Sequence, residues 1–169
     1  DHHYANAEAT RPLSAAVPPE RLESIAKRFY ADLGADPDAL GVRLDLQPRA
    51  GKTPVAFCNF GERRRTEGGV RKPTVPWIFA TYPAGGFDNL GELLHELGHA
   101  VHIAAIDTRP AFLDWPDLDA FWEALGDFVA LEAYEPAWQE RYLRTSVPPA
   151  GALPSKYGAM ALHVALALF

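Results

Sequence analysis

The chain has 169 residues, of which 48% are hydrophobic, and this predicts one domain with a substantial core rather than two. Sixteen basic residues against 22 acidic ones give a net charge of −6, which argues against nucleic acid as a partner, because phosphate binding requires a positive field. No apolar run approaches the roughly 20 residues of a membrane span, and the start lacks the pattern of a signal peptide, so we expect no membrane partner.

The first half of the chain predicts one helix followed by a small sheet. After a polar, proline-marked start, the segment from Pro18 to Gly34 has apolar residues at helical spacing. Three apolar or alternating runs predict strands, at 42–46, 54–60 and 76–82. The pieces between them, 48–52 and 61–73, are rich in glycine, proline and charge, and we expect loops there.

Two features of this half have simple structural interpretations. Five basic residues gather in the expected loop 61–73, where a solvated surface is a better interpretation than an anion site: Arg63, Arg64, Arg65, Arg71 and Lys72. The single cysteine, Cys58, lies in an apolar run, which fits a small buried thiol better than a nucleophile. A single cysteine also favours the cytoplasm over the periplasm, although the compartment stays open.

The second half is predicted to be helical. Residues 88–103 carry a broad apolar surface at helical spacing, with Asp88 as the expected N-cap. A proline-containing link at 109–116 leads to a helix from Asp117 or Asp119 to about Tyr134, which Pro136 closes or redirects. The segment 155–169 is apolar and helix-like and stops without a polar or glycine ending, so we expect the single domain 1–169 to be a fragment of a longer protein. Together the elements predict a mainly helical α+β fold.

The residues from His95 to His99 have the pattern H-E-x-x-H, a metalloprotease signature. Residues four apart on a helix are displaced by about 40° around the axis and about 6 Å along it, so the imidazoles of His95 and His99 can converge on one Zn²⁺. Glu96 lies about 100° from His95, where its carboxylate can accept a proton from a metal-bound water without ligating the metal. We therefore predict one zinc ion with Glu96 as the general base.

A catalytic zinc needs a third protein ligand, and Glu123 on the downstream helix is the candidate. Asp127 follows one turn later on the same face, where it can accept the other N–H of a ligating histidine and fix its ring. Other carboxylates compete for the role of third ligand: Asp114, Asp117, Asp119 and Glu132. Only Glu123 combines helical context with a supporting acid.

The alternative is a helix whose histidines are satisfied within the core, but the polar residues on this apolar helix and the nearby carboxylates favour the metal site. Gly98 costs about 1 kcal/mol in mid-helix against alanine, so we expect it to allow the close approach of another element. The remaining histidines receive other interpretations. His102 supports the site or is a partly exposed helix residue, His163 is structural, and His2 and His3 are terminal.

Several motifs in order resemble the thimet oligopeptidase, neurolysin and oligoendopeptidase F family of gluzincin metallopeptidases. They are L-D-L-Q-P-R-A-G-K at 44–52, C-N-F at 58–60 and H-E-L-G-H-A-V-H at 95–102, with D-H-H-Y at 1–4 similar to an upstream element of that family. The resemblance covers nearly the whole chain and implies a zincin-type catalytic core, with a small sheet packed on the H-E-x-x-H helix and a third-ligand helix after it. It also implies that His95, His99 and Glu123 hold the zinc.

The chain departs from that family at two places. The segment E-A-L-G-D at 123–127 looks more like the angiotensin-converting enzyme family, since the oligopeptidases usually follow the third ligand with proline and serine. Members of both families also carry a histidine and tyrosines in a glycine- and tyrosine-rich stretch well downstream, and Tyr157-Gly158 is too small a match to assign that role. The ligand roles carry over either way.

The leading functional hypothesis is zinc-dependent hydrolysis of peptide bonds in short peptides, with Glu96 as base. The gluzincin resemblance implies that the strand 76–82, directly before the H-E-x-x-H helix, is the sheet edge that pairs with an extended substrate. The alternatives are a non-catalytic zinc-binding fragment or pseudo-enzyme that binds peptides, and a gluzincin that releases C-terminal dipeptides. Mn²⁺ or Co²⁺ could occupy the same ligands. The oligomeric state and the peptide stay open.

Overall fold

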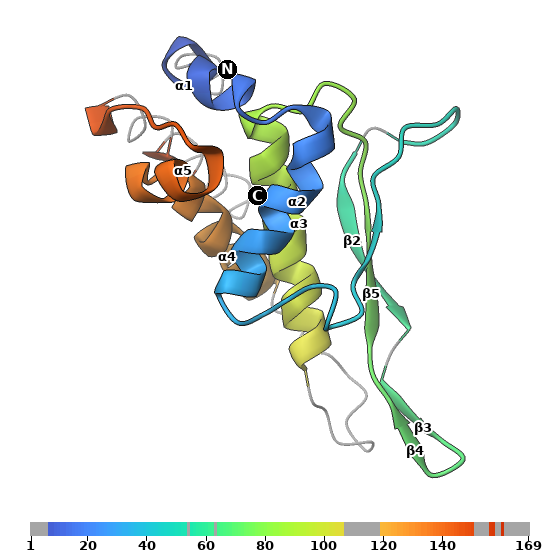
Figure 1. Cartoon of the computed structure of the whole chain (residues 1–169). Coiled ribbons are helices and arrows are strands. Elements are labelled where there is room, and N and C mark those ends of the chain that lie inside the picture. The colour runs from blue at the N-terminus through green and yellow to red at the C-terminus, as the bar shows by residue number, and fades with distance from the viewer. Residues whose placement is uncertain are drawn as a thin grey trace.

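A computed structural model describes residues 7–53, 55–62, 64–106, 119–150, 156, 157 and 160. The predicted link 109–116 and nearly all of the predicted helix 155–169 lie outside this part. The fold is α+β and mainly helical, with a small mixed sheet, as the sequence predicts. In Figure 1 the helix α3 (Phe87–Ala105) lies between the sheet on one side and α2 (Pro19–Asp32) and α4 (Asp119–Ala130) on the other.

The N-terminal region has one helix that was predicted and one that was not. The expected helix 18–34 is α2, which has a proline in its first turn and ends just before Gly34, a residue with a φ of +83°. The helix α1 (Ala7–Ala15) precedes it and contacts α3. It was missed because Pro12 lies inside it and its sequence has little apolar periodicity.

The three predicted strands form one sheet with the order β1-β5-β2. Their bounds are β1 (Arg43–Asp45), β2 (Phe57–Glu62) and β5 (Val75–Phe79). The central strand β5 pairs in parallel with β1 and in antiparallel with β2. Of its residues, Ile78 is fully buried whereas Trp77 is 36% exposed, so only one face of the sheet is covered.

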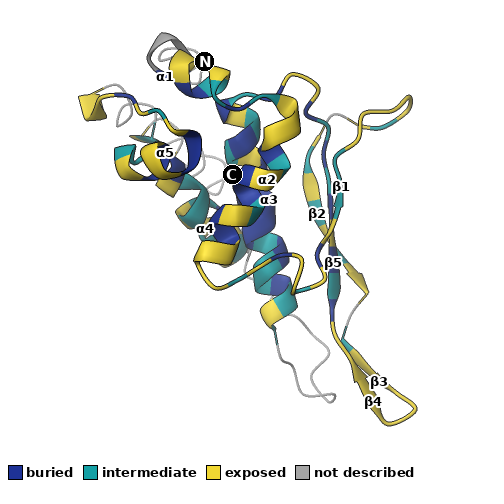
Figure 2. Ribbon diagram, viewed as in Figure 1, coloured by how far each residue is buried: buried dark blue, intermediate teal, exposed yellow. Residues whose placement is uncertain are grey.

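The prediction of a loop at 61–73 was wrong, because the chain there forms a hairpin of β3 (Arg65–Glu67) and β4 (Val70–Lys72). Its turn residues Gly68 and Gly69 both have positive φ, as a tight two-residue hairpin turn requires. Every residue of the two strands is exposed, and Figure 2 shows this hairpin projecting from the sheet. Without a buried face there is no alternation of apolar residues to reveal the strands.

The helix α3 supplies the largest share of the core. Its apolar residues Leu90, Leu93, Leu94, Leu97 and Ala100 are fully buried, and Figure 2 shows the helix mostly in the colours of buried and intermediate residues. The predicted N-cap was wrong, because the cap position is Gly86. Asp88 lies in the first turn, where its negative charge interacts favourably with the positive end of the helix dipole.

The predicted helix 117–134 is divided in the structure. The helix α4 ends at Ala130 and continues as a short 3-10 turn, η1 (Leu131–Tyr134). The chain is redirected at Pro136, as predicted, and Pro136 is the first residue of a further helix, α5 (Pro136–Leu143). Trp138 and Tyr142 of α5 are buried against Phe29 of α2, with ring centroids 5.4 Å apart in both pairs.

The helices α3 and α4 cross at two glycines, which confirms the expectation that Gly98 allows a close approach. A Cβ atom on Gly98 would lie 2.9 Å from the Cα atom of Gly126, and one on Gly126 would lie 3.0 Å from the ring of His95. The contact at Gly98 is too short for any side chain, and the contact at Gly126 would force the ring of His95 to shift, so the close crossing depends most strongly on Gly98. Within the described part of the chain, no helix combines the length and apolar character needed to span a bilayer.

Candidate metal centre

Three of the predicted site residues lie on α3. His95 and His99 are one turn apart on the side of the helix that faces α4, and their ring centroids are 4.5 Å apart. Their side chains are only 17% and 12% exposed. The leucines on the other sides of α3 hold the helix in the core, so the backbone positions from which both imidazoles project are fixed.

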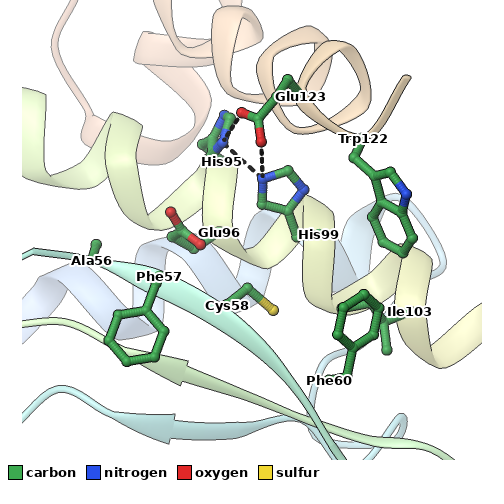
Figure 3. A pocket seen from close by; sticks show the side chains of 10 residues that line it. All are labelled: Ala56, Phe57, Cys58, Phe60, His95, Glu96, His99, Ile103, Trp122 and Glu123. Carbon is green, nitrogen blue, oxygen red and sulfur yellow. Dashed lines mark hydrogen bonds and ion pairs between the residues drawn. The ribbon is translucent and has the colours of Figure 1, made fainter. Parts of the chain in front are cut away.

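Glu123 of α4 faces both imidazoles (Figure 3). Its carboxylate oxygens lie 3.3 Å from Nε2 of His95 and 3.7 Å from Nε2 of His99, while the two Nε2 atoms are 2.9 Å apart. One ligand atom from each of the three residues falls within 4.8 Å of the others. The expected meeting of two imidazoles and a carboxylate is therefore observed, and metal binding itself stays a prediction.

Asp127 lies where the sequence predicts a supporting acid. Its Oδ1 atom is 2.8 Å from Nδ1 of His95, and its side chain is only 15% exposed. A neutral His95 that donates from Nδ1 to Asp127 carries its lone pair on Nε2, the atom that faces Glu123. Burial alone would lower the pKa of His95, but the hydrogen bond and charge of Asp127, together with the charges of Glu96 and Glu123, outweigh burial and raise it.

His99 differs from its neighbour because no carboxylate binds its second nitrogen as Asp127 does for His95 among the residues that the structure describes. Burial and the nearby His95 lower the pKa of His99 to about 4. The imidazole is therefore neutral near pH 7, which is the form that a metal ion requires.

Glu96 lies one residue after His95 and is only 8% exposed. Burial, together with the charges of Glu92 and Glu123, raises its pKa to about 7, although His95 and a backbone hydrogen bond from Cys58 act in the opposite direction. In Figure 3 the carboxylate of Glu96 points into the pocket, beside the ligand cluster and not towards the centre of the cluster. A carboxylate with a pKa near neutrality is suited to accepting and returning a proton.

A cleft of about 350 Å³ adjoins these groups. Ten residues line it, from β2, α3 and α4: Ala56, Phe57, Cys58, Phe60, His95, Glu96, His99, Ile103, Trp122 and Glu123. Its volume is within the range of about 300–1,000 Å³ that is usual for ligand sites. Figure 3 shows the side chains of α3 and α4 on one side and those of β2 on the other.

The expected role of the strand 76–82 as the sheet edge was wrong. The segment forms β5, which is the central strand, and its backbone groups are engaged by β1 and β2 on its two sides. The strand beside the cleft is β2, and in the described structure β2 pairs with β5 alone. The sequence could not reveal this, because the order of strands along the chain does not determine their order in the sheet.

The residues present fit a divalent transition metal such as zinc. Two imidazole nitrogens and one carboxylate form the donor set of many catalytic zinc sites, and the cleft gives access to them from one side. The Asp127–His95 hydrogen bond is the outer support that such ligands usually have. Glu123 is 58% exposed, so the third ligand lies on the solvent side of the cluster.

Of the competing carboxylates, the structure describes the side chain of Glu132 alone, and it does not join this cluster. Glu132 lies in η1 and is exposed. Asp119 is the first residue of α4, and its side chain is not among the described ones. Asp114 and Asp117 lie outside the described residues, as do the histidines at 2, 3 and 163. Tyr157 is 61% exposed, while its neighbour Gly158 lies outside the described part.

Cys58 and His102 have more definite positions than the sequence suggested. Cys58 lines the cleft and is only partly buried, which corrects the expectation of a core thiol. Burial and the charge of Glu96 raise its pKa to about 12, so the thiol stays protonated. The ring of His102 packs against Trp122, with centroids 4.4 Å apart, and is not among the candidate ligands.

Sequence reasoning missed the apolar residues of the cleft, Phe60, Ile103 and Trp122. Two of them carried a usable signal: Trp122 directly precedes Glu123, and Phe60 lies two residues after Cys58, on the same face of the strand. Searches against protein-family models, curated proteins and solved structures found no match to this chain. The family resemblance therefore stays a prediction.

Proposed function

We propose that the protein is a zinc-dependent peptidase that hydrolyses peptide bonds in short peptides. The observation that carries the proposal is the convergence of ligand atoms from His95, His99 and Glu123 within 4.8 Å, beside a cleft. This donor set leaves room for a water or a substrate oxygen at a fourth position, as catalytic zinc sites require. The gluzincin resemblance points to the same chemistry.

The residues around the cluster have separate roles in this proposal. A zinc ion bound there would polarise the scissile carbonyl and lower the pKa of a bound water. Glu96 takes a proton from the attacking water and returns it to the departing amine, a role that its burial and its pKa of about 7 support. Asp127 holds the ring of His95 through Nδ1, so that Nε2 faces the ligand cluster.

The edge strand β2 is the proposed backbone-binding element for the substrate. It lines the cleft through Phe57, Cys58 and Phe60, and among the described strands it pairs with β5 alone. An extended peptide that pairs with this edge would pass the ligand cluster with its backbone aligned, whatever its side chains. The cleft is small, so short peptides are the proposed substrate class.

The test combines metal content with turnover. The protein is expected to bind one zinc ion per chain and to cleave quenched fluorescent peptides, and both properties should be absent after chelation and return with zinc. The variant Glu96→Gln is expected to lower kcat by at least about 100-fold while it retains zinc, since general base catalysis contributes roughly 10²–10⁴-fold.

The exposed carboxylate Glu132 supplies the control, because Glu132→Gln makes the same chemical change outside the cluster and should leave kcat unchanged. Near-normal hydrolysis by Glu96→Gln would show that the assigned base is wrong. A protein that binds zinc and cleaves no peptide would be a non-catalytic zinc-binding protein.

A further inference from the structure

One end of the cleft is apolar, and its side chains come from three different elements. Phe60 belongs to β2, Ile103 to α3 and Trp122 to α4. The rings of Phe60 and Trp122 meet edge to face, with centroids 5.5 Å apart and an interplanar angle of 85°. Figure 3 shows these three side chains together on the His99 side of the ligand cluster, away from Glu96. We call these three residues the apolar corner.

The apolar corner is supported from behind. Ile103 is 2% exposed and so is part of the packed interior, whereas Phe60 and Trp122 are partly exposed towards the cleft. The ring of His102 packs on Trp122 at 4.4 Å from the side of α3. The corner therefore presents fixed aromatic surface, which binds an apolar group at a low cost in side-chain entropy.

The corner lies next to the reacting position. Trp122 directly precedes the candidate ligand Glu123, and its ring centroid is 6.5 Å from that of His99. This separation is no longer than one large side chain. A substrate residue whose backbone passes the ligand cluster can therefore place its own side chain in the corner.

We propose that Phe60, Ile103 and Trp122 form a specificity subsite that takes a large apolar side chain, aromatic or branched aliphatic, of a substrate residue beside the scissile bond. This inference rests on the proposed peptidase function and names the substrate class of that site. Burial of such a side chain between aromatic walls favours it over glycine by about 10- to 200-fold. Aspartate is disfavoured further, because its charge would lose water without gaining a partner in the corner.

The first experiment measures kcat/KM for a set of quenched peptides in which each residue flanking the cleaved bond is varied in turn among Phe, Leu, Gly and Asp. At one flanking position the wild-type protein is expected to prefer Phe or Leu over Gly by about tenfold or more. The variants Trp122→Ala and Phe60→Ala should reduce that preference to within about threefold.

Phe128→Ala is the matched control, since it removes a phenyl group from the same helix at a position that is 70% exposed and does not line the cleft. It should keep the wild-type preference. Zinc content and the unfolding midpoint are measured for each variant. Phe60→Leu and Trp122→Phe, which keep an apolar wall, replace the alanine variants if either fails to fold, and each should narrow the preference partially.

The second experiment separates this inference from the proposed catalysis. Zinc-loaded Glu96→Gln protein is titrated calorimetrically with the same peptides, and the Phe peptide should bind about tenfold more tightly than the Gly peptide, a difference that Trp122→Ala removes. Selective binding without turnover in the wild type would sustain the subsite and end the peptidase proposal. The subsite would be overturned if the wild type showed equal kcat/KM for the Phe and Gly peptides, or if the Glu96→Gln protein bound them with equal affinity. It would also be overturned if the preference survived the substitutions at both Trp122 and Phe60.

Discussion

The helices α2 and α4 both pack on α3, but they contribute different things to the molecule. Five residues of α2 are almost fully buried, and all of them serve packing: Leu22, Ile25, Ala26, Phe29 and Tyr30. Among the residues of α4 at 121–130, only Gly126 is buried, while Phe121 and Phe128 are more than half exposed. The difference indicates that α2 holds α3 in the core, whereas α4 brings functional groups to it.

The polar contacts follow the same division. The hydroxyl of Tyr30 on α2 donates to the backbone oxygen of Leu94 at 2.6 Å and so satisfies a buried carbonyl within the core. Glu123 and Asp127 on α4 instead engage the imidazole of His95. We therefore expect substitutions in α2 to change stability and substitutions in α4 to change zinc affinity.

The largest expected effect is on stability, from Phe29→Ala in α2. Phe29 is 4% exposed and contacts the rings of Tyr30, Trp138 and Tyr142, so its removal leaves a cavity and should lower the free energy of unfolding by about 3–5 kcal/mol. Phe128→Ala on α4 removes the same group from an exposed position and should change it by less than about 0.5 kcal/mol. Denaturant unfolding measures both free energies. Equal losses for the two variants would contradict the division of roles between α2 and α4.

The next effect is on zinc, from Glu123→Gln in α4. Its loss as a ligand should weaken zinc binding beyond the roughly 10- to 100-fold that is typical for outer-sphere partners. Because Glu123 is 58% exposed, the substitution should hardly change the unfolding midpoint of the protein from which the metal has been removed. A competition titration against a chromophoric chelator measures the affinity, and wild-type affinity would exclude Glu123 as the third ligand.

Asp127→Asn should have a smaller effect on the same quantity. An asparagine can still approach Nδ1 of His95, but it lacks the charge that makes the imidazole a better donor, so zinc affinity should fall by about 10- to 100-fold. The same chelator competition checks the value. A loss as large as that of Glu123→Gln would instead assign Asp127 a direct contact with the metal.

The last predicted effect concerns the pH dependence of the stability of the metal-free protein, measured in the presence of a chelator. The pKa of Glu96 is raised by burial from 4.5 to about 7, so the folded protein holds this proton more tightly than the unfolded chain. Its stabilising contribution is complete below about pH 4.5 and is lost as the pH rises through 7. Glu96→Gln should therefore match the wild type at low pH and be more stable than the wild type at pH 8, by about 3 kcal/mol. A constant difference at every pH would contradict this.

The core and the polar face of α3 were predictable because their signals are local. Leucines at helical spacing predict the helix, and the H-E-x-x-H spacing puts both imidazoles on one side of it. The partnership with Glu123 and Asp127 could be inferred because a second amphipathic helix carries two acids one turn apart. These inferences need only the periodicity of a helix.

The parts that were missed depend on tertiary contacts. The hairpin of β3 and β4 has no buried face, α1 contains a proline, and the central place of β5 follows from strand pairing rather than from strand sequence. The apolar corner was missed for the same reason, since Phe60, Ile103 and Trp122 look like ordinary core residues until three elements bring them together. Spacing along the chain carries no information on such meetings.

The crossing at Gly98 and Gly126 sets the reach between the two sides of the candidate site. With hydrogen as the only side chain at both positions, the axis of α4 lies close enough for one glutamate to span the remaining gap to both imidazoles. A methyl group at Gly98 would meet the backbone of Gly126 at 2.9 Å, so the two helices would have to move apart. The separation of the two helices at the crossing thus sets the distance that the side chain of Glu123 must span to reach the imidazoles.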